Sequence, residues 1–131
     1  MVDEMAVGSG VTFRERYKPD EHVVGFCVNV EADGLSAHLH GVELGAWDHV
    51  QLDDFVDKLA ADFRGWDGER VWKSPQLSLG ATFHSGGHVE LTWRLRPDPV
   101  QGGWRLCFPT WLDAGEAMLR LASDLRHFLR G

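Results

Sequence analysis

The sequence predicts an α+β domain: a six-stranded, mainly antiparallel sheet in βββαβββα order, with two helices packed on one of its faces. Two observations predict this class. Six stretches alternate apolar and polar residues, which is the period of a strand with one buried face. Two other stretches carry apolar residues at intervals of three and four, which is the period of an amphipathic helix. The 131 residues have the length of a single domain.

The first three strands are expected at residues 11–17, 22–30 and 35–44. Asp33-Gly34 predicts a tight turn between the second and third of them, because Gly readily adopts a positive φ. Residues 1–10 end in a Gly-Ser-Gly sequence, and we expect them to form a flexible arm.

The central helix is expected to begin at Leu52 and to end before Gly65, where Gly favours a helix C-cap. Residues 66–72 then form a connector rich in Trp and charged side chains, which we expect to be pinned to the sheet. The apolar stripe of the helix consists of Leu52, Phe55, Val56, Leu59, Ala60 and Phe63.

The second three strands are expected at residues 77–84, at residues 88–96 and from Trp104. Trp93 and Trp104 are in register with apolar neighbours, so both are predicted to lie in the core. Pro109 interrupts the last strand and predicts an edge position or a bulge, because Pro donates no ladder hydrogen bond. A final helix over 117–129 is expected to be capped by Asp113 together with Glu116.

The formal net charge is −7 and is unevenly distributed. Residues 1–69 hold 15 acidic residues and 5 Lys or Arg, a net charge of −10, whereas residues 70–131 have a net charge of +3. An acidic chain without a basic patch is a poor nucleic-acid binder and suits a basic partner. No apolar run approaches the about 18 residues of a membrane span, and the N-terminus lacks a signal-peptide pattern, so a cytoplasmic location is expected.

No motif for nucleophilic, acid–base or phosphate chemistry is present, so the sequence predicts no catalytic residues, no enzyme activity and no cofactor. His38 and His40 share one side of a strand, and His84 and His88 flank a hairpin turn. The two cysteines have no zinc-ligand spacing, so these imidazoles are predicted to be exposed strand residues with no bound metal. The alternative hypothesis is a domain that binds a small ligand or a metal on the His-bearing sheet face. This alternative includes an enzyme that uses that face.

Three segments carry a family resemblance. The run Phe55-Val56-x-x-Leu59-Ala60-x-Asp62-Phe63-Arg64-Gly65-Trp66-x-Gly68-Glu69-Arg70-x-Trp72 resembles an uncharacterised bacterial family, a domain of unknown function common in high-GC Gram-positive genomes. Gly86-Gly87-His88-Val89-x-Leu91-Thr92-Trp93 and Ala114-Gly115-Glu116 agree with it. The resemblance covers the chain from about Val23 onward and leaves Met1 to Asp20 outside.

The expected plan of a sheet with two helices is also similar to the immunity proteins of wall-associated and other polymorphic toxin systems. This similarity implies a small acidic cytoplasmic protein that binds another protein, and it carries over no residue roles. The leading hypothesis is therefore a non-enzymatic protein-binding module, an immunity-type protein that blocks a cognate toxin.

The predicted binding residues are the carboxylates of the helix face, which would steer a basic protein partner, and two Trp of the connector. Nothing in the sequence pairs with these carboxylates, so each is expected to add little to stability and more to the association rate. The residues are Asp53, Asp54, Asp57, Asp62, Trp66 and Trp72.

Overall fold

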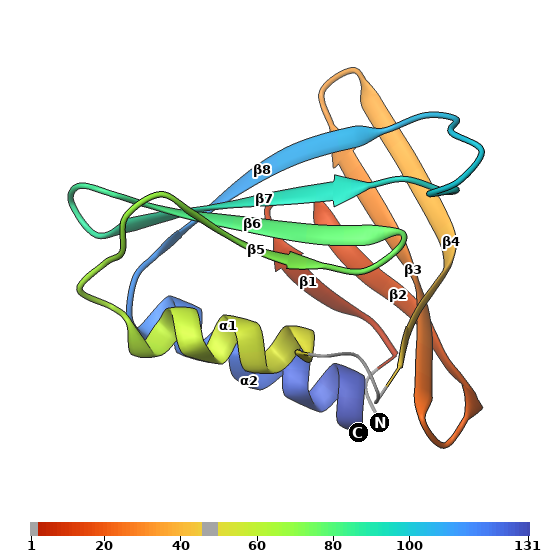
Figure 1. Ribbon diagram of the computed structural model, residues 1–131, viewed down its shortest axis with the longest axis horizontal. Helices are drawn as coiled ribbons and strands as arrows, with labels where there is room; N and C mark the ends of the chain where they lie inside the picture. The colour runs from red at the N-terminus through yellow and green to blue at the C-terminus, as the bar shows by residue number, and fades with distance from the viewer. Residues whose placement is uncertain (1–2, 46–49) are drawn as a thin grey trace.

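The computed structural model describes residues 3–45 and 50–131, and it contains two four-stranded antiparallel sheets (Figure 1). The predicted single six-stranded sheet is therefore wrong, although the chain keeps a mixed α+β architecture. Each sheet joins its strands in chain order, and a helix follows each sheet. The elements are β1 (Met5–Gly8), β2 (Val11–Asp20), β3 (Val23–Ala32), β4 (Leu35–Gly45), α1 (Leu52–Ala61), β5 (Glu69–Lys73), β6 (Leu77–His84), β7 (His88–Leu95), β8 (Leu106–Asp113) and α2 (Glu116–Arg130).

Two short strands account for the difference from the predicted order. Strand β1 lies within residues 1–10, where the sequence predicts a flexible arm, and it places Met5 opposite Phe13 of β2. Strand β5 lies within the predicted connector and places Trp72 opposite Leu79 of β6. Both strands are held by pairing with another part of the chain, so their local sequence gives little sign of them.

The core lies where the two sheets and α2 meet. Phe13 of β2 contacts the rings of Phe26, Trp93 and Phe128, at centroid distances of 4.5, 5.7 and 5.9 Å. All four rings are fully buried. Phe13 therefore links both sheets to α2, and the burial predicted for Trp93 is confirmed.

Strand β8 is the edge of the second sheet and contains Pro109, so the predicted edge position is confirmed. Trp104 precedes this strand and is 43% exposed, so its predicted core position is wrong. The regular alternation begins only at Leu106, and Trp104 lies in the loop before it.

The two helices lie side by side along the same side of the molecule (Figure 1). Helix α1 ends at Ala61, and Asp62 is its C-cap residue; Gly65 instead closes the following turn with φ 111°. The predicted Asp113 cap of α2 is wrong, because Gly115 precedes Glu116 and no side chain caps the helix. Neither helix in the described ranges is long and apolar enough to cross a membrane.

Gly8 marks a close approach between the two sheets. A Cβ atom at this position would lie 2.7–2.9 Å from three side-chain atoms of Thr110, a buried residue of β8. We expect Gly8→Ala to lower the free energy of unfolding by about 1–2 kcal/mol, because Thr110 has to move. Urea unfolding measures this loss, with Ser9→Ala at the exposed neighbouring position as the control. An unchanged midpoint for Gly8→Ala would show that β1 does not pack against β8.

Candidate functional site

The outer face of the second sheet carries a row of polar side chains that crosses all four of its strands. Strand β7 buries its apolar residues and turns Arg94 outward. The strand register places Arg94 between Ser78 of β6 and Cys107 of β8, and Ser78 pairs in turn with Lys73 of β5. Residues distant in sequence are thereby brought to one end of the sheet.

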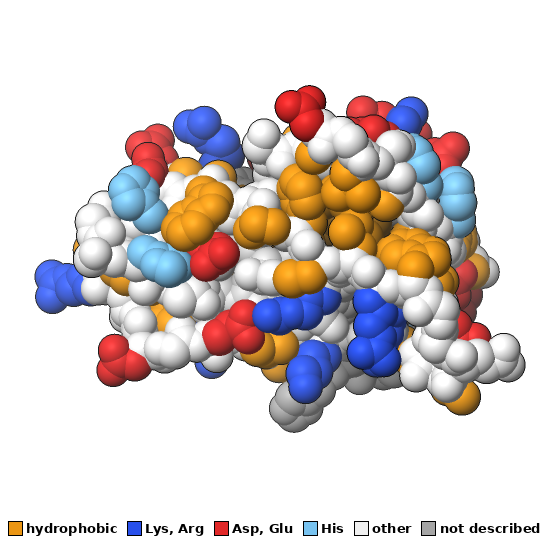
Figure 2. Space-filling model, turned by 90° about the horizontal axis from the view of Figure 1, so that it is seen from above, with side chains coloured by type: hydrophobic (Ala, Val, Ile, Leu, Met, Phe, Trp, Pro, Cys, Tyr) orange, Lys and Arg blue, Asp and Glu red, His pale blue; other side chains and the backbone are white. Residues whose placement is uncertain are grey.

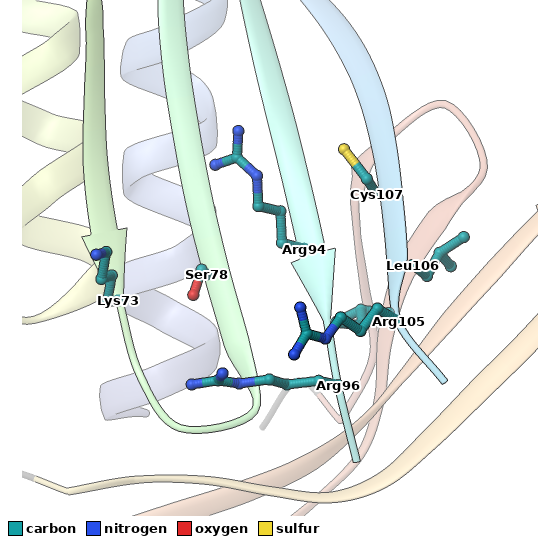
Figure 3. A pocket seen from close by; sticks show the side chains of 8 residues that line it. Lys73, Ser78, Arg94, Arg96, Arg105, Leu106 and Cys107 are labelled. Carbon is teal, nitrogen blue, oxygen red and sulfur yellow. The ribbon is translucent and has the colours of Figure 1, made fainter. Parts of the chain in front are cut away.

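A hollow of about 380 Å³ opens over this row (Figure 3). Arg96 and Arg105 extend in the same direction across it, whereas the side chain of Leu106 points the opposite way (Figure 3). Four of the lining side chains are cationic: Lys73, Arg94, Arg96 and Arg105. We call these four residues and the space between them the basic hollow.

Most of the positive charge of the basic hollow is not neutralised within the fold. Glu69 accepts a hydrogen bond of 2.8 Å from Nη2 of Arg94, and this bond raises the pKa of the Arg94 guanidinium. Arg96 donates from Nε to the Pro75 carbonyl at 2.8 Å, which fixes its position without removing its charge. Lys73 and Arg105 form no ion pair with any residue of 3–45 or 50–131. Among the described residues, the Glu69 carboxylate is thus the only one that forms an ion pair with any of these four cations.

Strand β8 and the loop before it carry two exposed Trp side chains, and Trp104 is next in sequence to Arg105 of the basic hollow. Trp104 is 43% exposed, and Trp111 is 54% exposed with its ring 4.9 Å from that of His84. Figure 2 shows Lys and Arg side chains gathered beside hydrophobic side chains on one face, with His side chains towards both ends. Exposed Trp next to Arg is the composition that favours the centre of a protein interface.

The structure places Asp53 and Asp54 differently from the sequence prediction. Asp53 is only 1% exposed, and its carboxylate lies 3.1 Å from Nε of Arg126 and 2.7 Å from Nε of Arg130. The same two arginines contact Asp54 at 2.9 and 3.0 Å. The hydrogen bond to Asp53 raises the pKa of the Arg126 guanidinium. The predicted absence of partners is therefore wrong for both carboxylates, which tie α1 to α2.

The other two carboxylates of the predicted helix face, Asp57 and Asp62, differ in whether they form an ion pair. Asp62 forms an ion pair with Arg70, across the turn that leads into β5. Asp57 is exposed and has no ion pair within the described part of the chain. Of the four carboxylates, Asp57 alone keeps the predicted environment, and the binding role of the set stays a prediction.

Trp66 and Trp72 both fix the connector through hydrogen bonds from their indole N–H groups, which confirms the prediction that it is pinned. Trp72 is buried and donates from Nε1 to the Val50 carbonyl at 2.8 Å. Trp66 is half-buried and donates from Nε1 to the Ala81 carbonyl at 3.0 Å, while the Arg70 guanidinium lies 4.9 Å from its ring centre. Trp72 is thus inaccessible to a partner, and Trp66 offers only part of its surface.

The predicted His-bearing face is divided between the two sheets. His38 of the first sheet hydrogen-bonds Asn29. His84 and His88 of the second sheet lie directly opposite each other, as expected, but each contacts its own carboxylate, Glu90 and Asp113 respectively. The four imidazoles therefore do not converge on one metal.

The basic hollow was not predicted, although the sequence contains a signal for it. Arg94 and Arg96 both fall on the outward side of the strand that the sequence predicts at residues 88–96, and residues 70–131 carry the net charge of +3. Lys73 could be assigned to this surface only if β5 were known to exist. Arg105 precedes β8, so strand alternation does not predict where its side chain lies. The prediction against nucleic acids assumed that no basic patch exists, and the hollow shows this assumption to be wrong.

A family model described as "Family of unknown function (DUF6228)" matches residues 2–131. The match includes the segment before Val23, which the resemblance seen in the sequence leaves out. No curated protein and no solved structure matches the chain.

Proposed function

The chain belongs to the DUF6228 family of unknown function, and we propose that it is a non-enzymatic module that binds an acidic protein partner at the basic hollow. The observation that carries this proposal is the excess of positive charge in an open hollow, in a chain whose net charge is −7. Lys73 and Arg105 have no carboxylate partner among the described residues, so their charge is available to a ligand. Cations placed in this way favour fast association with a surface of the opposite sign.

The surroundings of the basic hollow favour a protein over a nucleic acid. Affinity for nucleic acid depends largely on how many phosphates Lys and Arg neutralise, and a strongly salt-dependent binder makes about 6–10 such contacts. The basic hollow offers four cations, and the rest of the chain would repel a long polyanion. A protein partner needs only a few carboxylates here, and it would also cover the exposed Trp104.

The helix face is less suited to a basic partner than the sequence suggests. Three of its four carboxylates already contact arginines of this chain, so a basic protein would have to compete with those contacts. The immunity-type role, in which the chain blocks a cognate toxin, stays a prediction. In that role the toxin would present carboxylates to the basic hollow.

Charge reversal in the basic hollow tests this proposal. The variant Arg96→Glu/Arg105→Glu is compared with Arg120→Glu, which reverses an exposed cation on α2, away from the basic hollow. Binding of a fluorescent oligo-glutamate peptide is measured by anisotropy across salt concentrations, and labelled oligo-lysine and a labelled single-stranded oligonucleotide are measured separately in the same way. We expect the double variant to lose at least about tenfold in affinity for oligo-glutamate and Arg120→Glu to lose less than about twofold.

The natural partner is then identified by capture on the wild-type protein, and its purified form is measured against the same variants. An acidic protein whose association slows in the double variant and in high salt supports the proposal. Equal binding by the wild type and the double variant would overturn it, as would a preference for the oligonucleotide. A partner lost in Asp57→Lys but kept in the double variant would instead favour the helix face.

A further inference from the structure

Three side chains that can bind a metal converge on the outer face of the first sheet. They are Glu15 of β2, Cys27 of β3 and His40 of β4, and one ligand atom from each lies within 4.8 Å of the others. Cys27 is buried, whereas Glu15 and His40 are exposed. The three residues belong to adjacent strands, so the sheet itself fixes their separation.

Irregular pairing on both sides of Cys27 explains why these side chains meet. The register of β2 against β3 shifts between Arg14 and Tyr17, which leaves one extra residue in β2 beside Glu15. The register of β3 against β4 shifts between Phe26 and Val28, which leaves one extra residue in β4 beside His40. Such bulges redirect side chains and are common next to functional sites.

The backbone around the cluster follows from these bulges. Glu15 has φ 56°, and it is the only residue other than Gly with a positive φ among the described residues. Gly41, next to His40, has φ 72°. These conformations break the regular alternation of β2 and β4, and both flanking ligands lie at the breaks.

The three donors match the ligands that zinc prefers. A thiolate, an imidazole and a carboxylate are all common zinc ligands, and three protein ligands leave a fourth position for water. The thiolate disfavours Mg²⁺ and Ca²⁺, which take oxygen ligands. With a neutral His40, the charges of the thiolate and the carboxylate balance those of Zn²⁺, so the ion and its three protein ligands together would carry no net charge.

The thiol of Cys27 already has a hydrogen-bond acceptor within the same sheet. Cys27 Sγ donates to Asn29 Oδ1 at 3.1 Å, and the same oxygen lies 2.8 Å from Nδ1 of His38. Burial raises the pKa of the Cys27 thiol, and the charge of Glu15 raises it further, while Arg14 lowers it. Zinc would replace the thiol proton, so each ion bound would release one proton and the hydrogen bond to Asn29 would be lost.

We propose that Glu15, Cys27 and His40 bind one Zn²⁺ ion per chain, with water as the fourth ligand. This site goes beyond the protein-binding function, because it lies on the other sheet. It also replaces the sequence prediction of no bound metal. That prediction considered local ligand spacings, whereas these residues are separated by 12 and 13 positions and meet only through strand pairing.

Metal titration of the full chain tests the site. The protein is stripped with a chelator, and Zn²⁺ is added in competition with a chromogenic chelator. We expect one ion per chain. Cobalt in place of zinc should give the near-ultraviolet absorption of a thiolate–cobalt bond, and in the Cys107→Ser variant this band requires Cys27 to be the ligand. Glu15→Gln, Cys27→Ser and His40→Gln should each weaken zinc binding by more than about tenfold.

The controls remove the same residue types elsewhere. Cys107→Ser and His84→Gln should keep the wild-type zinc affinity. Circular dichroism checks the fold of every variant, and Glu15→Gln and His40→Gln change exposed side chains only. The proposal is overturned if no stoichiometric zinc is bound, if cobalt shows no thiolate band, or if a folded Glu15→Gln or His40→Gln variant binds zinc as the wild type does.

Discussion

Trp93→Ala is expected to lower the free energy of unfolding by roughly 3–5 kcal/mol, the range of a large-to-small change in a packed core. Trp93 is fully buried and meets the ring of Phe13 edge-on. Its Nε1 also donates to Thr110 Oγ1 at 3.0 Å. The substitution would leave a cavity at the junction of the two sheets, and Thr110 Oγ1 would keep only its bond to the Leu91 carbonyl.

Urea unfolding followed by circular dichroism measures this loss. Trp93→Phe should cost less, because it keeps an aromatic ring in the core and removes only the indole hydrogen bond. Trp111→Ala removes an exposed Trp of β8 and should change stability by less than about 1 kcal/mol. A near-wild-type midpoint for Trp93→Ala would contradict the assignment of Trp93 to the core.

The strands with clear alternation could be predicted from the sequence almost to the residue. Strand β6 was expected at 77–84 and is Leu77–His84; β7 was expected at 88–96 and is His88–Leu95. The alternation of apolar and polar residues predicts which side chains of a strand face inward, but it does not predict which strands pair with each other. For this reason the division into two sheets, with no pairing between β4 and β5, could not be predicted.

The functional surfaces were harder to predict than the strands because they depend on contacts distant in sequence. The contacts of Asp53 with Arg126 and Arg130 cross more than 70 residues and join two helices. The zinc ligands depend on two bulges, and a bulge breaks the alternation from which strands are recognised. The basic hollow includes Lys73 of β5, a strand that the local sequence does not predict.

Asp53 shows how such a contact reverses an expectation about stability. The sequence suggests an exposed carboxylate whose removal costs little. In the structure Asp53 is almost fully buried, and two arginines of α2 contact it. It also lies in the first turn of α1, where the helix dipole favours a negative charge.

We therefore expect Asp53→Ala to lower the free energy of unfolding by about 2–3 kcal/mol. Breaking a fully buried ion pair costs about 3–5 kcal/mol, but Arg126 and Arg130 are half-exposed and water can solvate them again. Asp57→Ala changes an exposed Asp of the same helix without an ion pair in the described ranges, and it should cost less than about 0.5 kcal/mol.

A double-mutant cycle between Asp53→Ala and Arg130→Ala isolates the contact between the helices from the effect of the helix dipole. We expect a coupling free energy of at least about 0.5 kcal/mol, because the two residues touch directly. The dipole effect of Asp53 does not depend on Arg130, so it cancels in the cycle. If Asp53→Ala and Asp57→Ala unfold at the same urea concentration and the coupling is zero, Asp53 is a solvated carboxylate. The acidic helix face would then be available to a basic partner, as the sequence suggests.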